Sequence, residues 1–480
     1  MKEFISVLLA VIITLMFVSI VGAANTSEVK GFGDIADHWA KRDIEYMTNK
    51  GIVDGVSSAV FAPEEAITRA EFLALVIRTI GAEEAPYDAA YADVDESAWY
   101  ARVIQTGKNL GIIDPAMTPN NEFKPDANIT REEMTSLIIR AYELGKEEKV
   151  QGADISAFND SEDVSDWARG YVERAYALSV IKGMSGKKLA PTETATRAQA
   201  VTIIRRLYKT TGKSLKILSI GNSFSYDSMK YLYGMLEECG YTDVVLGILY
   251  KGGCSLERHN NNIDGDIAEY KYYKNDSDYW GVTEGKCADD VVKDEDWDIV
   301  VLQQGSASSG LSETYEPYIT NILAYIKENA PEDVKFAWNL TWAYQQDSTH
   351  ASFPTYNSDQ LFMYNSILAA FRENVLQHNE FEYIFPVGTT VQNIRTSYIG
   401  DTITRDGHHM DYNIGRYAAA LTWLDVLTDV QIDEFDYIPK EVVIDESQRE
   451  VVRESVVNAL SNPGVITPSE FTKNPSANQQ

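Results

Sequence analysis

A threefold internal repeat constrains the first half of this chain more than any other feature of its sequence. Three segments begin with Thr-Arg and lie 62 and 66 residues apart: Thr68-Arg69-Ala70-Glu71, Thr130-Arg131-Glu132-Glu133 and Thr196-Arg197-Ala198-Gln199. Each follows a segment that ends in proline: Phe61-Ala62-Pro63, Phe123-Lys124-Pro125 and Leu189-Ala190-Pro191. Repetition at a nearly fixed period indicates a supersecondary unit that buries its apolar face against its own copies.

Each repeat is predicted to contain two helices joined by a loop. In the first copy, apolar residues recur at about the spacing of one helical turn up to Gly51, a residue type that is typical of a helix end. Thr68 then has the position and the side chain of an N-cap for a second helix. We therefore expect an all-α bundle made of three repeats, at residues 32–87, 88–147 and 155–210.

The repeated motifs resemble S-layer homology (SLH) repeats. That pattern has an F-x-D opening, an aromatic-rich first helix, a G-I/V-x-G turn, an F-x-P segment and an I-T-R-A-E start of the second helix. The third copy departs most, because Gln199 replaces the acidic residue and Ala195 replaces the isoleucine. The resemblance implies that grooves between the repeats bind a secondary cell-wall polysaccharide, typically one that bears pyruvate ketals. It also implies that the saccharide carboxylate is bound by Arg69, Arg131 and Arg197.

Two roles are open for these three arginines. A planar guanidinium at a helix start can bind a carboxylate through two hydrogen bonds, and the helix dipole assists this binding. Alternatively, each arginine pairs with a neighbouring Asp or Glu and locks the repeats together.

The acidic composition limits the classes of partner. The net charge is −30, from 72 acidic and 42 basic residues. Because phosphate contacts need basic patches, nucleic acid is not expected as a partner. Bulk charge would not hold this chain on a polyanionic cell wall either, so retention there would need specific contacts. The three cysteines are too few for a disulfide scaffold, and the sequence leaves a Cys254–Cys287 pair open.

The amino-terminal segment predicts a secreted protein. The chain is almost uncharged from Phe4 to Ala24 and ends this run with small residues. This pattern is typical of a signal peptide at residues 1–24. The alternative is a retained membrane anchor, since the apolar run is long enough to span a bilayer. No later apolar run has that length, so we expect no transmembrane segment after signal cleavage.

Short apolar runs alternate with amphipathic segments from residue 215 onward. Strands are expected at residues 217–220, 244–250, 299–303, 334–340 and 383–387, with a short one at 441–444. Helices are expected at residues 229–238, 318–328, 361–376, 414–427 and 448–460, whereas 255–297 reads as irregular. The alternation predicts a three-layer α/β domain with a mostly parallel sheet at residues 215–462, followed by a polar tail at 463–480. Functional groups should then gather at the carboxyl ends of the strands.

Two motifs of this domain suit nucleophilic catalysis. Gly221-Asn222-Ser223 follows the first predicted strand, and Asp406-Gly407-His408-His409 precedes the helix predicted at 414–427. A serine hydroxyl needs a base to become a good nucleophile, and the base needs an acid that orients it. An aspartate three residues before a histidine can supply both from one tight loop. Adjacent histidines tend to point to opposite sides and rarely bind one ion together, so no metal or other cofactor is expected.

The order and spacing of these motifs resemble the SGNH/GDSL hydrolase superfamily, in particular a poorly characterised branch found in bacterial secreted proteins. The resemblance implies that Ser223 is the nucleophile, Asp406 the orienting acid and His409 the base. His408 falls at a variable position of the family and is expected to shape the pocket.

The same resemblance implies an oxyanion hole. Gly252 or Gly253, after the second strand, would contribute a backbone N–H beside that of Ser223. Asn222 stands where the family usually has aspartate, and both side chains can form hydrogen bonds within the turn.

The third family block, G-x-N-D, is absent from this chain. In its place stands Leu302-Gln303-Gln304-Gly305-Ser306. A third hydrogen bond to the oxyanion would therefore come from Gln303, Gln304 or Ser306, and the sequence does not choose among them.

These features predict a secreted serine esterase that is held on the bacterial cell wall by its SLH repeats. Its substrate would be an acylated glycan, from which it removes O-acetyl or other small acyl groups; this follows from the location and from family analogy. Most aromatic residues between 255 and 280 are expected to pack in the fold, whereas one or two of them, or Trp342 and Tyr344, would stack on sugars. The alternative is a non-catalytic surface protein whose C-terminal domain binds glycan.

Overall fold

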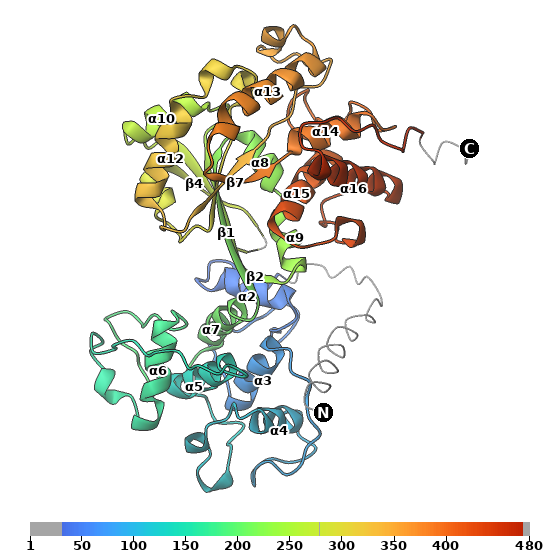
Figure 1. The fold of residues 1–480 in the computed structure, drawn as a ribbon. Coiled ribbons are helices and arrows are strands. Elements are labelled where there is room, and N and C mark those ends of the chain that lie inside the picture. Colours follow the sequence, from blue (N-terminus) through green and yellow to red (C-terminus); the bar gives the residue numbers. More distant parts are fainter. Residues whose placement is uncertain (1–30, 278, 474–480) are drawn as a thin grey trace, which may run out of the picture.

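The computed structural model describes residues 31–277 and 279–473. Two domains follow one another along the chain, a helical domain built from the three repeats and an α/β domain (Figure 1). The predicted signal peptide at residues 1–24 lies outside the described residues. Among the described residues, no helix is long and apolar enough to cross a membrane.

Both predicted helices are present in every repeat, which confirms the all-α bundle. The first helices are α2 (Lys41–Asn49), α4 (Ala101–Asn109) and α6 (Asp166–Ala177), and the second helices are α3 (Arg69–Thr79), α5 (Arg131–Tyr142) and α7 (Arg197–Lys209). Each second helix begins with a capping box, in which the N-cap threonine and the third helical residue bond to each other's backbone N–H. Gln199 keeps this box in the third repeat, because its amide oxygen takes the place of a carboxylate oxygen.

The three repeats close into a ring. Single antiparallel backbone bridges join the segments in front of the second helices: Ala66 with Thr196, Thr68 with Asn128, and Thr130 with Thr194. Helices α3, α5 and α7 therefore contact one another, and their apolar side chains are buried in a common core. This arrangement places the start of each second helix beside the next repeat.

The α/β domain contains a seven-stranded sheet with the strand order β4-β3-β2-β1-β5-β6-β7. The strands are β1 (Lys213–Gly221), β2 (Tyr241–Tyr250), β3 (Tyr270–Asn275), β4 (Gly281–Lys286), β5 (Ile299–Leu302), β6 (Lys335–Asn339) and β7 (Phe381–Phe385). Strands β1, β2, β5, β6 and β7 are parallel, which confirms the predicted mostly parallel sheet. The antiparallel pair β3 and β4 extends one edge, so the prediction of irregular structure is wrong there. Tyr270 and Tyr272 are buried in this part of the fold, a tertiary effect that the local pattern does not show.

Helices cover both faces of the sheet and give the predicted three layers (Figure 1). One face carries α8 (Ser223–Met229), α9 (Leu232–Glu238), α14 (Val387–Arg395), α15 (Ile414–Leu427) and α16 (Glu446–Ser461). The other carries α10 (Leu256–Asp264), α11 (Ala288–Val292), α12 (Tyr318–Asn329) and α13 (Gln360–Asn374).

Three local predictions in this domain are wrong. The helix expected at 229–238 is split, because α8 begins at the serine and the chain turns at Lys230 and Tyr231 before α9. Helix α14 was not expected, since its Val, Gly and Thr residues have low helix propensity; contacts with α15 and α16 stabilise it instead. Residues 441–444 do not form a strand, and the Val443 N–H donates to the Asn413 side chain (2.8 Å).

The carboxyl-terminal end of the described chain packs along α14. The Thr467 N–H donates to the Asn393 side chain and the Ser469 N–H to the Thr396 hydroxyl, both at 2.8 Å. Residues 463–473 of the predicted polar tail are thus bonded to the domain, and 474–480 lie outside the described residues.

All three cysteines are free thiols. The disulfide that the sequence left open is therefore not formed. Cys254 is buried in the loop after β2, whereas Cys287 is the N-cap of α11.

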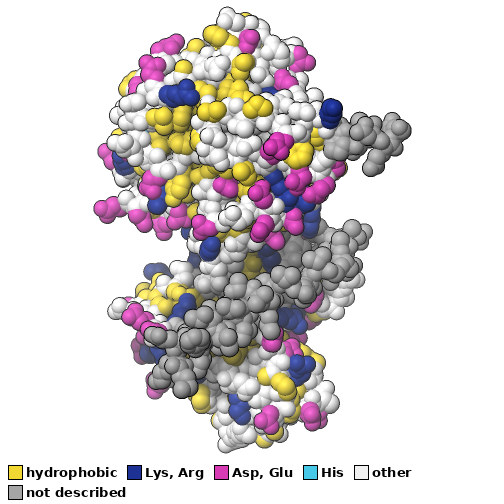
Figure 2. Space-filling view, turned by 45° about the vertical axis from the view of Figure 1, so that its right-hand side comes forward, with side chains coloured by type: hydrophobic (Ala, Val, Ile, Leu, Met, Phe, Trp, Pro, Cys, Tyr) yellow, Lys and Arg dark blue, Asp and Glu magenta, His cyan; other side chains and the backbone are white. Residues whose placement is uncertain are grey.

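The two domains contact each other through charged side chains. The Lys209 ammonium lies 2.7 Å from the Asp243 carboxylate, and Arg42 pairs with Asp276 in the turn between β3 and β4. On the face shown in Figure 2, acidic side chains are spread over the α/β domain, in keeping with the net charge of −30.

Candidate active site

Ser223 is the first residue of α8 and lies at the carboxyl end of β1. Asn222 caps this helix, since its Oδ1 accepts the N–H of Phe224 (3.0 Å). Gly221 ends β1 where a Cβ would lie 2.1 Å from the Ser225 hydroxyl oxygen, so a larger residue would displace its surroundings. A tight turn from a parallel strand into a helix is a typical position for a nucleophilic serine.

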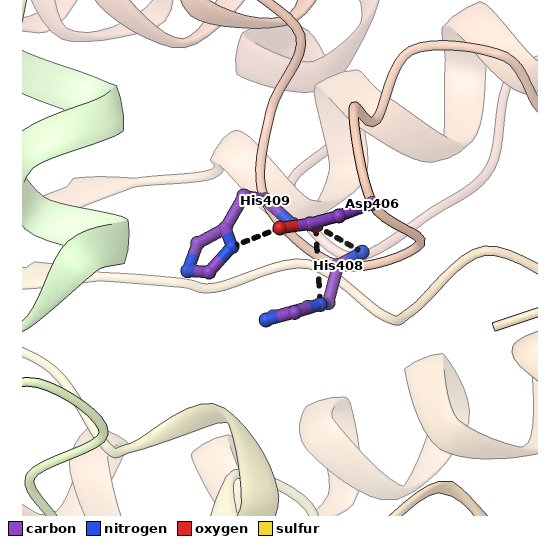
Figure 3. Close-up of side chains that lie close together, drawn as sticks. All are labelled: Asp406, His408 and His409. Carbon is purple, nitrogen blue, oxygen red and sulfur yellow. Dashed lines mark hydrogen bonds and ion pairs between the residues drawn. The ribbon is translucent and has the colours of Figure 1, made fainter. Parts of the chain in front are cut away.

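The structure brings together the three side chains that the sequence assigns to catalysis. Ser223 Oγ lies 2.8 Å from His409 Nε2, and His409 Nδ1 lies 2.6 Å from Asp406 Oδ2. Figure 3 shows the carboxylate between the two histidines of its loop. Burial raises the pKa of Asp406, but hydrogen bonds from the His409 side chain and from the N–H groups of His409 and His408 outweigh this effect and bring the pKa to about 2. Asp406 is thus ionised at neutral pH.

The loop 406–409 has a fixed conformation. The Gln345 N–H, in the loop after β6, donates to the Gly407 carbonyl (2.8 Å). Gly407 has a φ of +86°, and a Cβ at this position would lie 2.9 Å from the Ser348 hydroxyl oxygen. The positive φ and the lack of space for a Cβ explain why glycine occupies the turn between the acid and the base.

Trp342 and Tyr344 support this site from the interior of the domain. Both side chains are 0% exposed. The Trp342 ring stacks on Phe224 with ring centroids 4.0 Å apart, and its indole N–H donates to the His408 carbonyl (2.7 Å). The prediction that these two aromatic residues stack on sugars is therefore wrong, because a ligand cannot reach them.

The loop 251–254, which contains Gly252 and Gly253, lies against the turn of the serine. The Lys251 N–H donates to the Gly221 carbonyl at the end of β1 (3.1 Å). The Asn222 side-chain amide donates to the Cys254 carbonyl at the end of the loop (3.1 Å). An ionised aspartate at this position could not donate the second bond, so asparagine matches its surroundings here. The two glycines thus lie in the loop next to Ser223.

Gln303 and Gln304 belong to the buried framework beneath the serine. The Gln303 amide donates to Asn222 Oδ1 (3.0 Å) and accepts from the Asn339 amide (2.9 Å). The Gln304 amide donates to Thr314 (2.9 Å) and accepts two backbone N–H groups. Both side chains are buried, so neither faces the exposed side of the serine.

Ser306 differs from these two glutamines. It is half-exposed, and its hydroxyl lies 3.0 Å from the Tyr344 hydroxyl. Of the three side chains named for a third oxyanion donor, Ser306 is the one at the surface.

Asp406, His408 and His409 form the group of possible metal ligands among the described residues, with ligand atoms within 4.8 Å of one another. The expectation that adjacent histidines point to opposite sides is wrong here, because both Nδ1 atoms face Asp406, at 3.1 Å for His408 and 2.6 Å for His409 (Figure 3). The left-handed turn at Gly407 brings both rings to one carboxylate. His409 and Asp406 already bond to each other, and His409 bonds to Ser223, so the group suits proton transfer better than a tetrahedral metal site.

Sequence reasoning missed a buried carboxylate behind the site. Asp227 lies on α8 and binds Arg405 and Arg416, which are 178 and 189 residues away in the sequence. Because its partners are distant, no local motif marks it.

The three repeat arginines lie at the junctions between repeats. Each Nε donates to a backbone carbonyl of the next repeat: Arg69 to Phe123, Arg131 to Leu189 and Arg197 to Phe61, at 2.7, 2.8 and 3.0 Å. Arg69 is buried and also pairs with Glu133 of the second repeat. Its charge therefore holds two repeats together, which is the second of the two roles left open by the sequence.

Arg197 lines an open groove of about 250 Å³ between the third and the first repeat. The lining is of mixed charge, because Asp54 and Glu71 face the same groove as Arg197 and Arg78. Trp99 of the second repeat completes it.

Arg131 lines a second open groove, of about 310 Å³, which we call the basic groove. Its lining includes Trp39, Arg131, Lys182, Gln199 and Arg206, and no carboxylate is among the described residues that line it. Gln199 occupies the position that Glu71 and Glu133 occupy at the other two junctions. The residue that departs from the repeat pattern thus removes an acidic neighbour of Arg131.

Two family models match this chain. The S-layer homology domain matches residues 31–73, 90–135 and 157–201, and the family described as Domain of unknown function (DUF4886) matches residues 216–459. A crystal structure of a DUF4886 family protein from Bacteroides uniformis is 35% identical, with a TM-score of 0.52, and the match covers 54% of this chain and 100% of that chain.

Curated relatives match less than half of this chain. Exoglucanase XynX of Acetivibrio thermocellus is 38% identical over 173 residues, which is 36% of this chain and 16% of that protein. The Surface-layer 125 kDa protein of Lysinibacillus sphaericus is 31% identical over 203 residues, which is 42% of this chain and 16% of that protein. The chain therefore spans less than a fifth of the length of either relative.

Proposed function

The chain belongs to the DUF4886 family, with three SLH repeats in front of its α/β domain, and we propose that this domain is a serine ester hydrolase of the SGNH type. The observation that carries the proposal is the hydrogen-bonded chain from Ser223 through His409 to Asp406. A serine hydroxyl, an imidazole in contact with it and an ionised carboxylate on the other ring nitrogen are the parts that acyl transfer requires.

The proposed reaction has two steps. His409 accepts the Ser223 proton at Nε2 while the serine oxygen bonds to the ester carbonyl carbon, and Asp406 stabilises the imidazolium. The ester C–O bond then breaks, and His409 gives its proton to the departing alcohol oxygen. In the second step, water attacks the acyl-serine with the same base, which releases the carboxylic acid and restores the serine.

Backbone N–H groups would stabilise the negative charge of the tetrahedral intermediate. The Ser223 N–H lies in the first turn of α8, where N–H groups have no partner within the helix. Gly252 or Gly253 would supply a second N–H from the loop that packs beside this turn. Ser306 is our candidate for the third donor, because it is the one of the three candidate residues that is not buried.

The SLH repeats indicate a cell-surface protein, and the predicted signal peptide agrees with that location. A hydrolase held there would meet polysaccharide, so we propose O-acetyl or other small acyl groups on glycans as its substrate. XynX, which is named as an exoglucanase, is similar to this chain over 173 residues, and this similarity supports a setting of polysaccharide degradation.

Hydrolysis of an activated acetyl ester by the full chain tests the catalytic proposal. Ser223→Ala should lower kcat by about 10³-fold or more, with an unchanged melting temperature. Release of acetate from O-acetylated xylan or wall polysaccharide then tests the substrate class. Equal rates of ester hydrolysis for the unsubstituted chain and Ser223→Ala would refute the esterase proposal and favour a non-catalytic glycan-binding domain.

We also propose that the basic groove binds an anionic wall polysaccharide. Residues 155–210 contain nine basic and six acidic residues, whereas 32–87 contain five and ten, and 88–147 contain six and eleven. In a chain with a net charge of −30, a ligand with carboxylates needs such a local basic site. Trp39, which is 63% exposed at the groove, offers a flat apolar face to a sugar ring.

Co-sedimentation of the full chain with purified cell walls tests this second proposal. The chain should pellet with intact walls and stay in solution when the walls have been stripped of their non-peptidoglycan polysaccharide. Equal pelleting with both preparations would refute a polysaccharide ligand.

A further inference from the structure

A single buried carboxylate connects the helix of the serine with the loop of the acid and the base. Asp227 lies on α8, one helical turn after Ser223, and its side chain is 0% exposed. Its oxygens accept hydrogen bonds from the guanidinium groups of Arg405 (3.0 and 3.1 Å) and Arg416 (2.8 Å). They also accept the N–H of Met410 (3.0 Å).

The positions of two of these partners in the chain link Asp227 to the site. Arg405 directly precedes Asp406, and Met410 directly follows His409. One carboxylate of α8 therefore binds both ends of the segment that carries the acid and the base. Arg405 also closes the segment on itself, since its N–H donates to the His409 carbonyl (2.9 Å) and its guanidinium donates to the Met410 carbonyl.

A third partner fixes the carboxylate relative to the rest of the domain. Arg416 lies on α15 and is buried, with its guanidinium 5.4 Å from the Tyr226 ring and 4.8 Å from the Tyr412 ring. Asp227 is thus bonded to α15 as well as to the acid–base loop.

A contribution to stability does not by itself explain this buried network of charged residues. Taking a carboxylate out of water is costly, and well-packed apolar residues often stabilise a core at least as well as a buried ion pair. Hydrogen bonds to a fixed carboxylate instead set distances, and catalytic groups must be held within about 0.5 Å of their productive geometry. The network links the serine helix to the acid–base loop without using any atom that takes part in the reaction.

We propose that Asp227 is a positioning residue, which keeps His409 within hydrogen-bond distance of Ser223 by clamping the segment 405–410 to α8. This inference rests on the proposed serine esterase function. Because Asp227 is buried and cannot touch substrate, its loss should slow the chemical step and leave substrate affinity almost unchanged.

The full chain carrying Asp227→Asn, Arg405→Met or both substitutions tests the inference. Asparagine keeps the shape and one acceptor oxygen but removes the charge. We expect kcat with an activated acetyl ester, and the rate of Ser223 labelling by a fluorophosphonate, to fall by about 10- to 100-fold in each single variant, with KM changed by less than about threefold. The double variant should be at most about twofold slower than the slower single variant, because both substitutions break the same clamp.

Val456→Ala is the control for lost stability. Val456 is buried on α16, so this substitution should lower the melting temperature without slowing the labelling of Ser223. Labelling of Asp227→Asn at the rate of this control would refute the inference, and so would independent, multiplying losses in the double variant.

Two further outcomes are separable. If Asp227→Asn does not fold, Arg405→Met decides alone, and an unchanged labelling rate in that variant refutes the inference. An unsubstituted chain in which Ser223 is neither labelled nor active refutes the esterase proposal itself, whereas labelling that both substitutions leave unchanged refutes only the role of Asp227.

Discussion

Replacing Asn222 by the aspartate of the SGNH pattern should destabilise this protein. Asn222 is 2% exposed, and its amide nitrogen donates to the Cys254 carbonyl (3.1 Å). Its oxygen accepts from the Phe224 N–H and from the Gln303 amide, both at 3.0 Å. An aspartate keeps the two accepted bonds but loses the donated one, and it places a negative charge against a carbonyl oxygen.

The size of the effect follows from these contacts. Loss of the bond to the Cys254 carbonyl costs about 1 kcal/mol, and an unsatisfied carbonyl that faces a buried charge adds about 1–3 kcal/mol. The two accepted bonds become charge-assisted, which returns about 1 kcal/mol. We therefore expect the free energy of unfolding of Asn222→Asp at pH 7 to be about 1–3 kcal/mol below that of the unsubstituted chain.

The same substitution has a pH dependence of predictable sign. Burial raises the pKa of the new carboxyl group in the folded state above its unfolded value of about 3.9. The penalty is complete at neutral pH and shrinks as the pH falls through the raised folded pKa, because the protonated carboxyl group can again donate to the Cys254 carbonyl.

Urea unfolding of the α/β domain, followed by tryptophan fluorescence at pH 7 and near pH 4, measures both effects. Asn261→Asp adds the same charge at an exposed position of α10 and should change the stability by less than about 0.5 kcal/mol. A variant Asn222→Asp that is as stable as the parent at pH 7, or a penalty that does not shrink on acidification, would show that the asparagine is not needed as a donor.

Three other predictions concern the site and the repeats. Asp406→Asn should lower kcat by about 10³-fold or more in the acetyl ester assay at a similar KM. Because the pKa of Asp406 is about 2, protonation of this carboxylate should not limit the activity of the unsubstituted chain above about pH 4. A loss of activity at acidic pH that is present in the unsubstituted chain and absent from Asp406→Asn would contradict that assignment. Gly407→Ala should lower both the melting temperature and kcat, because alanine is strained at a φ of +86° and its Cβ would crowd Ser348. A melting temperature and a kcat equal to those of the unsubstituted chain would show that the loop relaxes. Gln199→Glu should weaken wall co-sedimentation, because it places a carboxylate beside Arg131, and pelleting equal to the parent would argue against the basic groove as the binding site.

The parts of the site that the sequence predicted are those that short segments carry. The acid and the base share one loop of four residues, and Ser223 follows a strand within a turn that requires Gly221. Both motifs can be recognised in a short stretch of sequence, because the rules for glycine, helix capping and residue spacing act over a few residues. The capping boxes of the repeats were predictable for the same reason.

The parts that escaped prediction depend on partners that are far away in the sequence. Asp227 reads as an ordinary helix residue until the fold brings Arg405 and Arg416 to it. Gln303 reads as an oxyanion donor until Asn222 and Asn339 are seen to occupy its amide. In both cases the side chain is of the right type for catalysis, and only its burial and its bonded partners show that it shapes the site from behind.

The repeat arginines show how one motif takes different roles through its neighbour. At each junction, the arginine of one repeat meets the third helical residue of the next, which is Glu133 for Arg69, Gln199 for Arg131 and Glu71 for Arg197. The copy whose motif fits the pattern least therefore leaves Arg131 without an acidic partner at this position, in the groove that also holds two other cations. A carboxylate ligand would meet no lining carboxylate in the groove at this junction, whereas at the Arg69 junction it would have to displace a bonded glutamate. Affinity for the wall should thus be set by pairs of adjacent repeats, and not by how well any single repeat matches the motif.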